Sequence, residues 1–433
     1  MSTEILNTYA KYDSYKDSGV DWLGDVPSDW GVIKLKHLVS IRKRIIGHEG
    51  VSVLSITQKG IKVKDITSGE GQLSMDYSKY QVVDKGDFAM NHMDLLTGYV
   101  DISKFDGVVS PDYRVFTNDS QNADDSYLLK IFQMGYAQKI FFKYGQGVSM
   151  LGRWRLPADN FNEFLVPLPS LKEQKKIIGF LEQKTTQIDQ AIDLKQQQIK
   201  RLNEYKRIII QNAVTKGLNP DAKMKDSGVE WIGEIPEHWG IKRLKYIFEV
   251  IQTGTTPSTV NDKFYNGNIN WYSPKDLNEE ILKDSKRKVS RLALDQKEVK
   301  LFEADSVLVV GIGATSGKTA YMSVDSTFNQ QITGFHSKSQ LNLYYFYLLQ
   351  SMSTLVLNLA NYTTLPILNN EFFKALSLTV PPINEQRLIV QHIESFNEKY
   401  NTNLIIFKQQ IERLKEYKTI LINQAVTGKI KVS

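Results

Sequence analysis

The sequence predicts a mixed α/β protein built as a pseudo-two-fold internal repeat. Two globular blocks, each a twisted β-sheet with helices, would each be followed by one long helix. Three observations support this prediction. A short segment rich in Gly, Pro and Trp occurs twice, and a long segment with heptad spacing occurs twice. The chain of 433 residues is also longer than the roughly 250–300 residues that one hydrophobic core usually accommodates. With 41% apolar and 24% charged residues, the composition is that of folded globular domains.

The short repeat reads KDSGVDWLGDVPSDWG from Lys16 and KDSGVEWIGEIPEHWG from Lys225. Its apolar residues follow neither helical nor strand spacing, which indicates an ordered loop that packs on another part of the molecule. The Trp, Gly and Pro residues that the two copies share are 209 positions apart: Trp22 and Trp231, Gly24 and Gly233, Pro27 and Pro236, and Trp30 and Trp239.

The long repeat reads IKRLNEYKRIIIQNAVTKG from Ile199 and IERLKEYKTILINQAVTGK from Ile411, at an offset of 212. Apolar residues at heptad spacing predict two coiled-coil helices of about 43 residues and about 65 Å each. Because the two apolar seams match, we expect the helices to pair with each other, with docking onto other chains as the alternative. The seams comprise Leu181, Ile188, Ile192, Ile199, Leu202, Ile209 and Ala213, and Ile393, Tyr400, Leu404, Ile411, Leu414, Leu421 and Ala425.

These repeats divide the chain into four expected parts. Residues 1–170 form an N-terminal arm and the first block, 171–216 the central helix, 217–383 the second block, and 384–433 the C-terminal helix. Inside the blocks, short β-rich runs (DFAM, YRVF, SVLVV) alternate with turn signals (YNGN, FDGV) and one aromatic helical stretch each, SYLLKIF or LYYFYLL. We expect these aromatic residues in the core and not in a base-stacking platform.

Charge and composition restrict the partners. The net charge is +6, and the two helical segments concentrate it, with ten basic and five acidic residues over 172–216 and eight and five over 385–433. This pattern favours a polyanion near the helices, although solvated lysines are an equal alternative. The absence of cysteine excludes disulfides and thiolate metal sites, and neither a leader peptide nor a membrane span is visible, so a cytoplasmic location is expected.

The sequence matches none of the enzymatic motifs considered next. In SVLVVGIGATSGKTA, a phosphate-binding P-loop requires glycine where Ile312 stands, and Gly311, Gly313 and Gly317 miss the dinucleotide pattern by one residue. The six histidines stand singly without metal-ligand spacing, and no G-x-S-x-G or adenine methyltransferase tetrapeptide occurs. We therefore expect no catalytic residue, metal or cofactor, and a nucleotide-binding enzyme using the Gly311–Thr319 loop remains an alternative.

Several polar segments are candidates for DNA contacts, because Arg and Lys suit guanine edges and phosphates while Asn and Gln can form paired hydrogen bonds with adenine. In the first block the candidates are Arg42, Lys43, Arg44, Lys59, Arg114, Arg153 and Arg155. In the second block they are Thr255, Thr256, Ser258, Lys275, Thr315, Ser316, Lys318, Asn329, Gln330, Gln331 and Thr363.

The order of motifs along the chain resembles that of the specificity subunit of type I restriction-modification systems. The motifs that carry the resemblance are the paired DSGVxWxGxxPxxWG segments, the TGTTPST and GATSGKTA stretches, the PLPSLKEQ and PPINEQ segments that lead into the helices, and the duplicated helices. The resemblance covers nearly the whole chain. It implies two target recognition domains held by an antiparallel coiled coil, each reading one half of a divided, asymmetric site in double-stranded DNA. It also implies that two methyltransferase subunits dock on this chain, that restriction subunits join them, and that catalysis and cofactors belong to those partners.

Two further hypotheses remain open on this basis. Trp22, Trp30, Trp231 and Trp239 are expected either to pack at the junction with the helices or to dock a methyltransferase subunit. The chain as a whole would otherwise be a coiled-coil scaffold without DNA preference.

Overall fold

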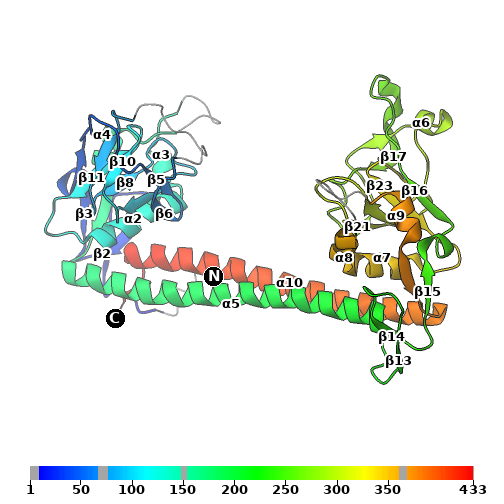
Figure 1. Cartoon of the computed structure of the whole chain (residues 1–433). Coiled ribbons are helices and arrows are strands. Elements are labelled where there is room, and N and C mark those ends of the chain that lie inside the picture. The colour runs from blue at the N-terminus through cyan, green and yellow to red at the C-terminus, as the bar shows by residue number, and fades with distance from the viewer. Residues whose placement is uncertain (1–8, 67–76, 148–153, 360–367, 433) are drawn as a thin grey trace. The chain divides into compact units, whose positions relative to one another are not determined.

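Two long helices follow the proline-containing stops: α5 (Leu171–Lys216) and α10 (Ile383–Val426), as the heptad pattern predicts. The computed structural model describes residues 9–66, 77–147, 154–359 and 368–432. It divides into two units, unit 1 with residues 1–196 and 408–433 and unit 2 with residues 197–407. Each unit therefore contains a block together with a part of both helices (Figure 1).

The two helices lie side by side in antiparallel orientation. In unit 1, Lys418 of α10 pairs with Asp189 of α5 at 2.6 Å. In unit 2, Tyr400 donates to Asn203 at 2.5 Å, and the Phe396 ring lies 5.6 Å from that of Tyr205. Residue numbers thus increase along α5 while those of the contacting residues in α10 decrease. The predicted seam residues are buried or half-buried, which confirms the helix pairing expected from the heptads.

Unit 1 is built on a four-stranded antiparallel sheet in the order β4, β11, β8, β9. Phe88 and Phe116 stack at 4.9 Å on neighbouring strands, and Phe132 of the helix α2 packs edge-on against both, so the aromatic stretch SYLLKIF lies in the core as predicted. The sheet strands are Val39–Arg42, Arg114–Asn118, Phe88–Met90 and Val100–Ile102, and the helices are α2 (Asp125–Ala137), α3 (Ile140–Lys143) and α4 (Ala158–Asn162).

In the described residues of unit 1, four two-stranded pairs accompany this sheet, all antiparallel. They are β1 (Tyr15–Asp17) with β2 (Asp25–Pro27), β3 (Gly31–Lys34) with β12 (Leu165–Leu168), β5 (Leu54–Thr57) with β6 (Gly60–Val63), and β7 (Gln81–Val83) with β10 (Gly107–Val109).

Unit 2 has a five-stranded sheet in the order β16, β23, β20, β21, β18, antiparallel except for the parallel edge pair of β18 and β21. Helix α7 (Asn342–Ser351) packs on β20 and β21, and its residues Tyr344 to Tyr347 are at most 3% exposed, which confirms the core role expected for LYYFYLL. The strands are β16 (Val250–Thr253), β23 (Ile332–His336), β20 (Ser306–Val310), β21 (Thr319–Met322) and β18 (Ile281–Leu282).

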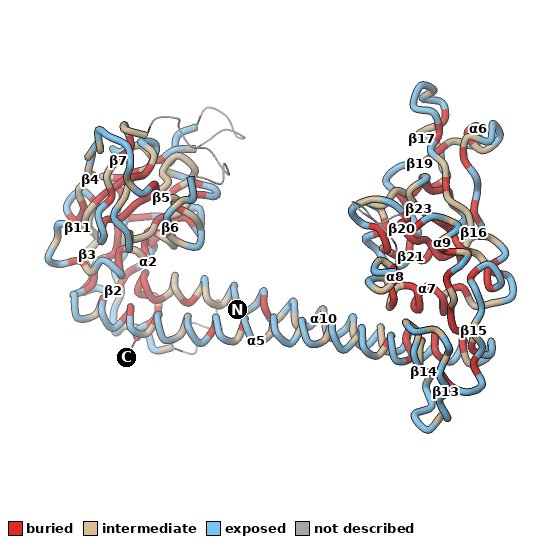
Figure 2. Tube along the Cα trace, viewed as in Figure 1, coloured by how far each residue is buried: buried red, intermediate tan, exposed pale blue. Residues whose placement is uncertain are grey.

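A second, three-stranded sheet of unit 2 has the order β19, β17, β22. The remaining elements are paired strands and short helices: β17 (Tyr265–Tyr272), β19 (Lys288–Val289), β22 (Thr327–Phe328), β13 (Met224–Asp226) with β14 (Glu234–Pro236), β15 (Gly240–Arg243) with β24 (Ser377–Val380), α6 (Arg291–Asp295), α8 (Ser353–Leu359) and α9 (Asn370–Ala375). Single 3-10 turns lie at Leu35–His37, Leu244–Tyr246 and Asp262–Phe264. Figure 2 shows buried residues gathered in the blocks and at the helix ends beneath them.

The short repeat forms the same hairpin in both units. Its first glycine receives a side-chain cap, Gly19 N donating to Asp17 Oδ1 at 2.9 Å and Gly228 N to Asp226 Oδ1 at 3.0 Å. Both glycines have a φ of 68°, a left-handed conformation that favours glycine, which explains why the residue recurs.

The hairpin packs on the end of the long helix that the other repeat contributes. A Cβ placed on Gly428, just after α10, would lie 2.4 Å from Pro27 and 3.1 Å from Trp30, and one on Gly217, just after α5, would lie 3.3 Å from Trp239. Trp30 and Trp239 are 0% and 1% exposed. These contacts favour the packing role for both residues.

A buried tyrosine completes each junction. The Tyr127 hydroxyl donates to Val426 O at 3.0 Å, and the Tyr344 hydroxyl donates to Val214 O at 2.8 Å. The two acceptors are 212 positions apart, the offset of the long repeat. Each unit therefore has the same kind of junction between its block and the helices, whereas the blocks themselves differ.

Candidate nucleic-acid interface

Five of the predicted DNA-contact residues come together in unit 2 around one hollow of about 710 Å³, which we call the basic hollow. Its lining contains four basic side chains and no acidic one, so it is suited to a polyanion. The predicted residues in its lining are Lys275, Thr315, Lys318, Asn329 and Gln331.

The loop from Gly311 to Lys318 forms one wall of the basic hollow. It connects β20 to β21, which pair antiparallel, and Gly317 N donates back to Val310 O at 2.8 Å. A phosphate-binding P-loop instead leads from a strand into a helix whose N-terminal amides hold the phosphates. The strand-to-strand connection therefore argues against the nucleotide-binding alternative for this loop.

Hydrogen bonds fix the polar side chains at the wall of the basic hollow. Asn329 donates from Nδ2 to Gln331 Oε1 at 2.9 Å and accepts from Gln331 N at 3.1 Å. The Lys318 ammonium group donates to Asn278 Oδ1 at 2.5 Å. Asn329 is 6% exposed and thus holds the half-buried Gln331 amide in a defined orientation, as readout of a base edge requires.

Other predicted residues of the second block have mixed roles. Thr256 donates its hydroxyl hydrogen to Gln330, and both side chains lie at the surface beside the hollow. Thr255 acts through its backbone, accepting from Trp271 Nε1 at 3.0 Å. Ser258 is exposed, whereas Ser316 is 8% exposed and donates to Gly313 O at 2.7 Å, which supports the loop. Thr363 lies outside the described residues.

Sequence reasoning missed two basic residues of the basic hollow, Lys286 and Arg287. They belong to the basic run Lys286–Lys288, whose last residue begins β19, and the Arg287 guanidinium lies 5.7 Å from the centre of the Trp271 ring. Three consecutive basic residues were a visible signal, but without the fold nothing connected them to the loops at 275 and 315.

The basic candidates of the first block lie in different settings. Arg42 pairs with Asp119 at 2.8 Å, and Arg44 pairs with both Asp84 and Asp87. These carboxylates offset the charge that each arginine would offer to DNA. Lys43, Lys59 and Arg155 are exposed, and Arg153 lies outside the described residues.

Arg114 is buried, with 5% of its surface exposed, and its guanidinium donates to Leu156 O at 2.8 Å and stacks over Phe161 at 4.7 Å. Burial lowers the pKa of Arg114 to about 10. Its position favours a role in holding the Leu156 segment over a direct DNA contact. Beside it, burial together with the charges of Arg114 and Arg155 lowers the pKa of His92 to about 4.

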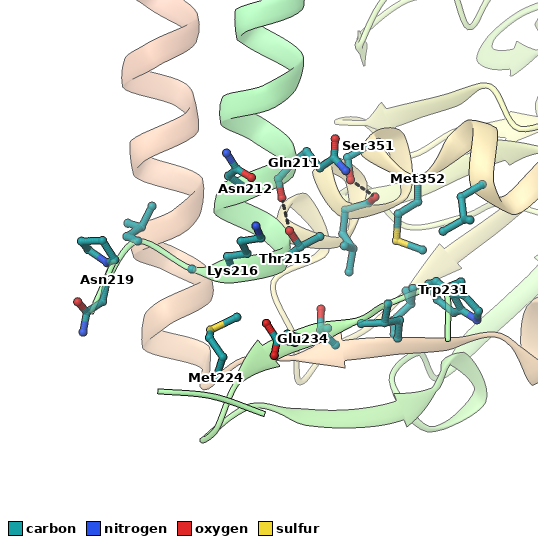
Figure 3. A pocket seen from close by; sticks show the side chains of 18 residues that line it. Gln211, Asn212, Thr215, Lys216, Asn219, Met224, Trp231, Glu234, Ser351 and Met352 are labelled. Atoms are coloured by element: carbon teal, nitrogen blue, oxygen red, sulfur yellow. Dashed lines mark hydrogen bonds between the residues drawn. The ribbon is translucent and has the colours of Figure 1, made fainter. Parts of the chain in front are cut away.

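Trp22 and Trp231 are half-buried and differ between the units. Trp22 stacks on Phe164 at 5.4 Å with the rings 10° from parallel. Trp231 instead lines a hollow of about 840 Å³ that lies between the end of α5, the β13–β14 hairpin and the end of α7 (Figure 3). Figure 3 shows Lys216 at the helix end, Glu234 on the hairpin, and Met352 near Trp231.

A Ser, a His and a Glu side chain lie close together in unit 2, as in a hydrolase triad, but the serine is not accessible. The Ser306 Oγ lies 3.2 Å from His336 Nδ1, and His336 Nε2 lies 3.3 Å from Glu303. Ser306 is 0% exposed and donates to Glu303 O at 2.7 Å, so it offers no accessible nucleophile. In the described part of the chain, no three His, Cys, Asp or Glu side chains are grouped to hold a metal, and no helix could span a membrane.

The fold defines an internally repeated protein in which two unlike blocks join the long helices through equivalent junctions. The block of unit 2 carries the basic hollow. The family model for the type I restriction modification DNA specificity domain matches residues 27–204 and again residues 236–415. The chain therefore belongs to the type I restriction-modification DNA specificity family.

Similar proteins carry the same description. A chain of Methanocaldococcus jannaschii, named putative type I restriction enzyme MjaX specificity subunit, is 22% identical over 448 residues, which cover 99% of both chains. The Escherichia coli protein named type I restriction enzyme EcoR124I/EcoR124II specificity subunit is 24% identical over 275 residues, or 60% of this chain and 62% of that one.

Solved structures share the fold. One, described as the structural basis of complex assembly and conformational transition of the type I R-M system, has a TM-score of 0.67 at 14% identity and covers 93% of this chain and 98% of its own. The HsdS subunit of Thermoanaerobacter tengcongensis has a TM-score of 0.54 at 15% identity, covering 94% and 98%. These likenesses extend over both units and both long helices.

Proposed function

We propose that this chain is the DNA specificity subunit of a type I restriction-modification complex and that each block reads one half of a divided DNA target. The basic hollow of unit 2 is the observation that carries the proposal. It joins four basic side chains to the half-buried amide of Gln331, which Asn329 holds in place, and so combines phosphate attraction with a group able to distinguish bases.

The target should be asymmetric. The junctions are alike in the two units, whereas the blocks differ in sheet order and in their polar side chains. A duplex has local two-fold symmetry in its backbone, so equivalent junctions suit two half-sites on opposite strands. Unlike blocks would then read unlike half-sites, separated by bases that neither block contacts.

Methyltransferase subunits would dock on this chain, and restriction subunits would join them; catalysis would belong to these partners. The helices support docking because they expose large apolar side chains: Tyr205 at 53%, Ile208 at 43%, Ile405 at 55% and Ile406 at 42%. Exposed apolar residues on a helix pair favour contact with a protein partner over contact with DNA alone.

The half-buried Trp231 is a second candidate docking point, since it lines the hollow of Figure 3. For Trp22, stacking on Phe164 favours a packing role. If Trp231 docks a partner, Trp231→Ala should weaken methyltransferase pull-down without lowering the melting temperature, whereas a packing residue would lower the melting temperature.

Selection from randomised duplex DNA tests the proposal. The chain, assembled with its methyltransferase partner, should enrich two unlike half-sites at one fixed gap at physiological salt. Enrichment of one continuous palindrome would contradict the proposal, and the absence of any enriched sequence would favour the scaffold alternative.

A further inference from the structure

We infer that Arg287 reads a guanine in the half-site of unit 2. This inference rests on the proposed function and assigns one base position within it. Arg287 is exposed and lines two adjoining hollows, the basic hollow and a second one of about 620 Å³ beside Asn266 and Lys288.

The backbone of Arg287 is fixed. Its carbonyl oxygen accepts hydrogen bonds from Trp271 N at 3.1 Å and from Ser285 Oγ. Trp271 is itself 3% exposed and tied through Nε1 to Thr255 O. Arg287 lies in the bend directly before β19, and its backbone is hydrogen-bonded to Trp271 of β17, so the side chain starts from a fixed point.

The side chain of Arg287 is oriented as well. Its guanidinium lies 5.7 Å from the centre of the Trp271 ring, a contact that holds the planar fork without using its hydrogen-bond donors. No ion pair among the described residues includes Arg287. Arg42, Arg44 and Arg291 differ, because each is paired with an aspartate.

A guanine is the ligand that fits this arrangement best. An oriented arginine fork can donate two hydrogen bonds to O6 and N7 of guanine, a pattern that no other base offers in the major groove. Two of the three lysines that line the basic hollow, Lys275 and Lys286, have flexible point charges that suit the neighbouring phosphates.

The experiment compares Arg287→Ala and Arg287→Lys with the unaltered chain, each assembled with the methyltransferase partner and offered randomised duplex DNA. Arg291→Ala is the matched control, since Arg291 lies four residues away, is 76% exposed and pairs with Asp295 at 3.2 Å. Both Arg287 variants should lose the preference for guanine at one position of one half-site, by roughly ten- to hundredfold. The other half-site, the gap and the Arg291→Ala profile should not change.

Two results would overturn the inference while leaving the proposed function intact: unchanged half-sites in both Arg287 variants, or an equal loss of affinity for all sequences with a smaller salt dependence, which marks a phosphate contact. If the unaltered chain enriches no sequence, the proposed function fails and the inference fails with it.

Discussion

A single buried hydroxyl group joins each block to a long helix. Tyr344 is 0% exposed, and burial raises the pKa of its hydroxyl well above the usual value, so the group stays protonated and donates to Val214 O. Tyr127 does the same for Val426 O in unit 1. These hydrogen bonds satisfy backbone carbonyl groups in the last turn of each long helix. Without them, the carbonyl groups would be buried without a partner.

Tyr344→Phe should therefore lower the free energy of unfolding by about 1–2 kcal/mol, because it leaves a buried carbonyl unpaired while keeping the ring. Urea denaturation of the full chain would measure this. Tyr246→Phe is the control, since Tyr246 is 68% exposed and should change stability by only a few tenths of a kcal/mol, about the usual surface value. Equal effects of both changes would contradict the role assigned to Tyr344.

Unit 1 should lose stability in mild acid because of His92. The folded protein keeps His92 neutral down to a pKa of about 4, whereas the unfolded chain takes up the proton near pH 6.5, so acid favours the unfolded chain between these values. From pH 7 to pH 5 the loss should be on the order of 1–2 kcal/mol. Thermal unfolding at both pH values would show it, and His92→Gln should reduce the difference, whereas substitution of the exposed His48 should not.

At the residue scale, sequence reasoning separated polar from apolar positions but not free charges from paired ones. Arg114 and Arg287 look alike in a sequence, yet one is 5% exposed in the core and the other lies at the surface of a hollow. Pairing depends on which loops meet, as when Arg44 pairs with Asp84 and Asp87, which lie 40 and 43 positions further along the chain. Only the fold decides that.

At the scale of elements, patterns with a fixed period were predictable. The seven-residue period and the flanking prolines placed both long helices, and the aromatic stretches placed α2 and α7. The YNGN segment was predicted as a turn, but it lies within β17, where Asn266 has a φ of 57° and the register with β19 shifts. A turn dipeptide and a β-bulge use the same left-handed residue, so the sequence signal does not separate them.

The helix pair should set the gap between the half-sites. Removing one heptad from α5 (residues 195–201) and the facing heptad from α10 (residues 403–409) preserves the seam and shortens the pair by about 10 Å, or about three base pairs of DNA. DNA selection should then return the same two half-sites with a gap shortened by about that amount. A constant gap would show that the helices do not determine the spacing.

At the scale of the whole molecule, the repeated junction predicts that the blocks can be exchanged. In both units the block meets the helices through a glutamine at the start of one long helix, with Gln174 accepting from Asp124 N at 2.7 Å and Gln386 accepting from Leu341 N at 3.1 Å. A foreign block of this family inserted at residues 31–168, with the hairpin and helices retained, should change one half-site completely. The other half-site and the gap should stay, and a change in both half-sites would show that the blocks do not read independently.

The divided target is the central claim, and genome-wide mapping of methylated bases in a host carrying the complete complex tests it most directly. We expect one motif with two unlike specified halves, a fixed unspecified gap, and a methylated base in each half, on opposite strands. A single uninterrupted motif, or methylation that depends on the sequence matched by only one unit, would contradict the account.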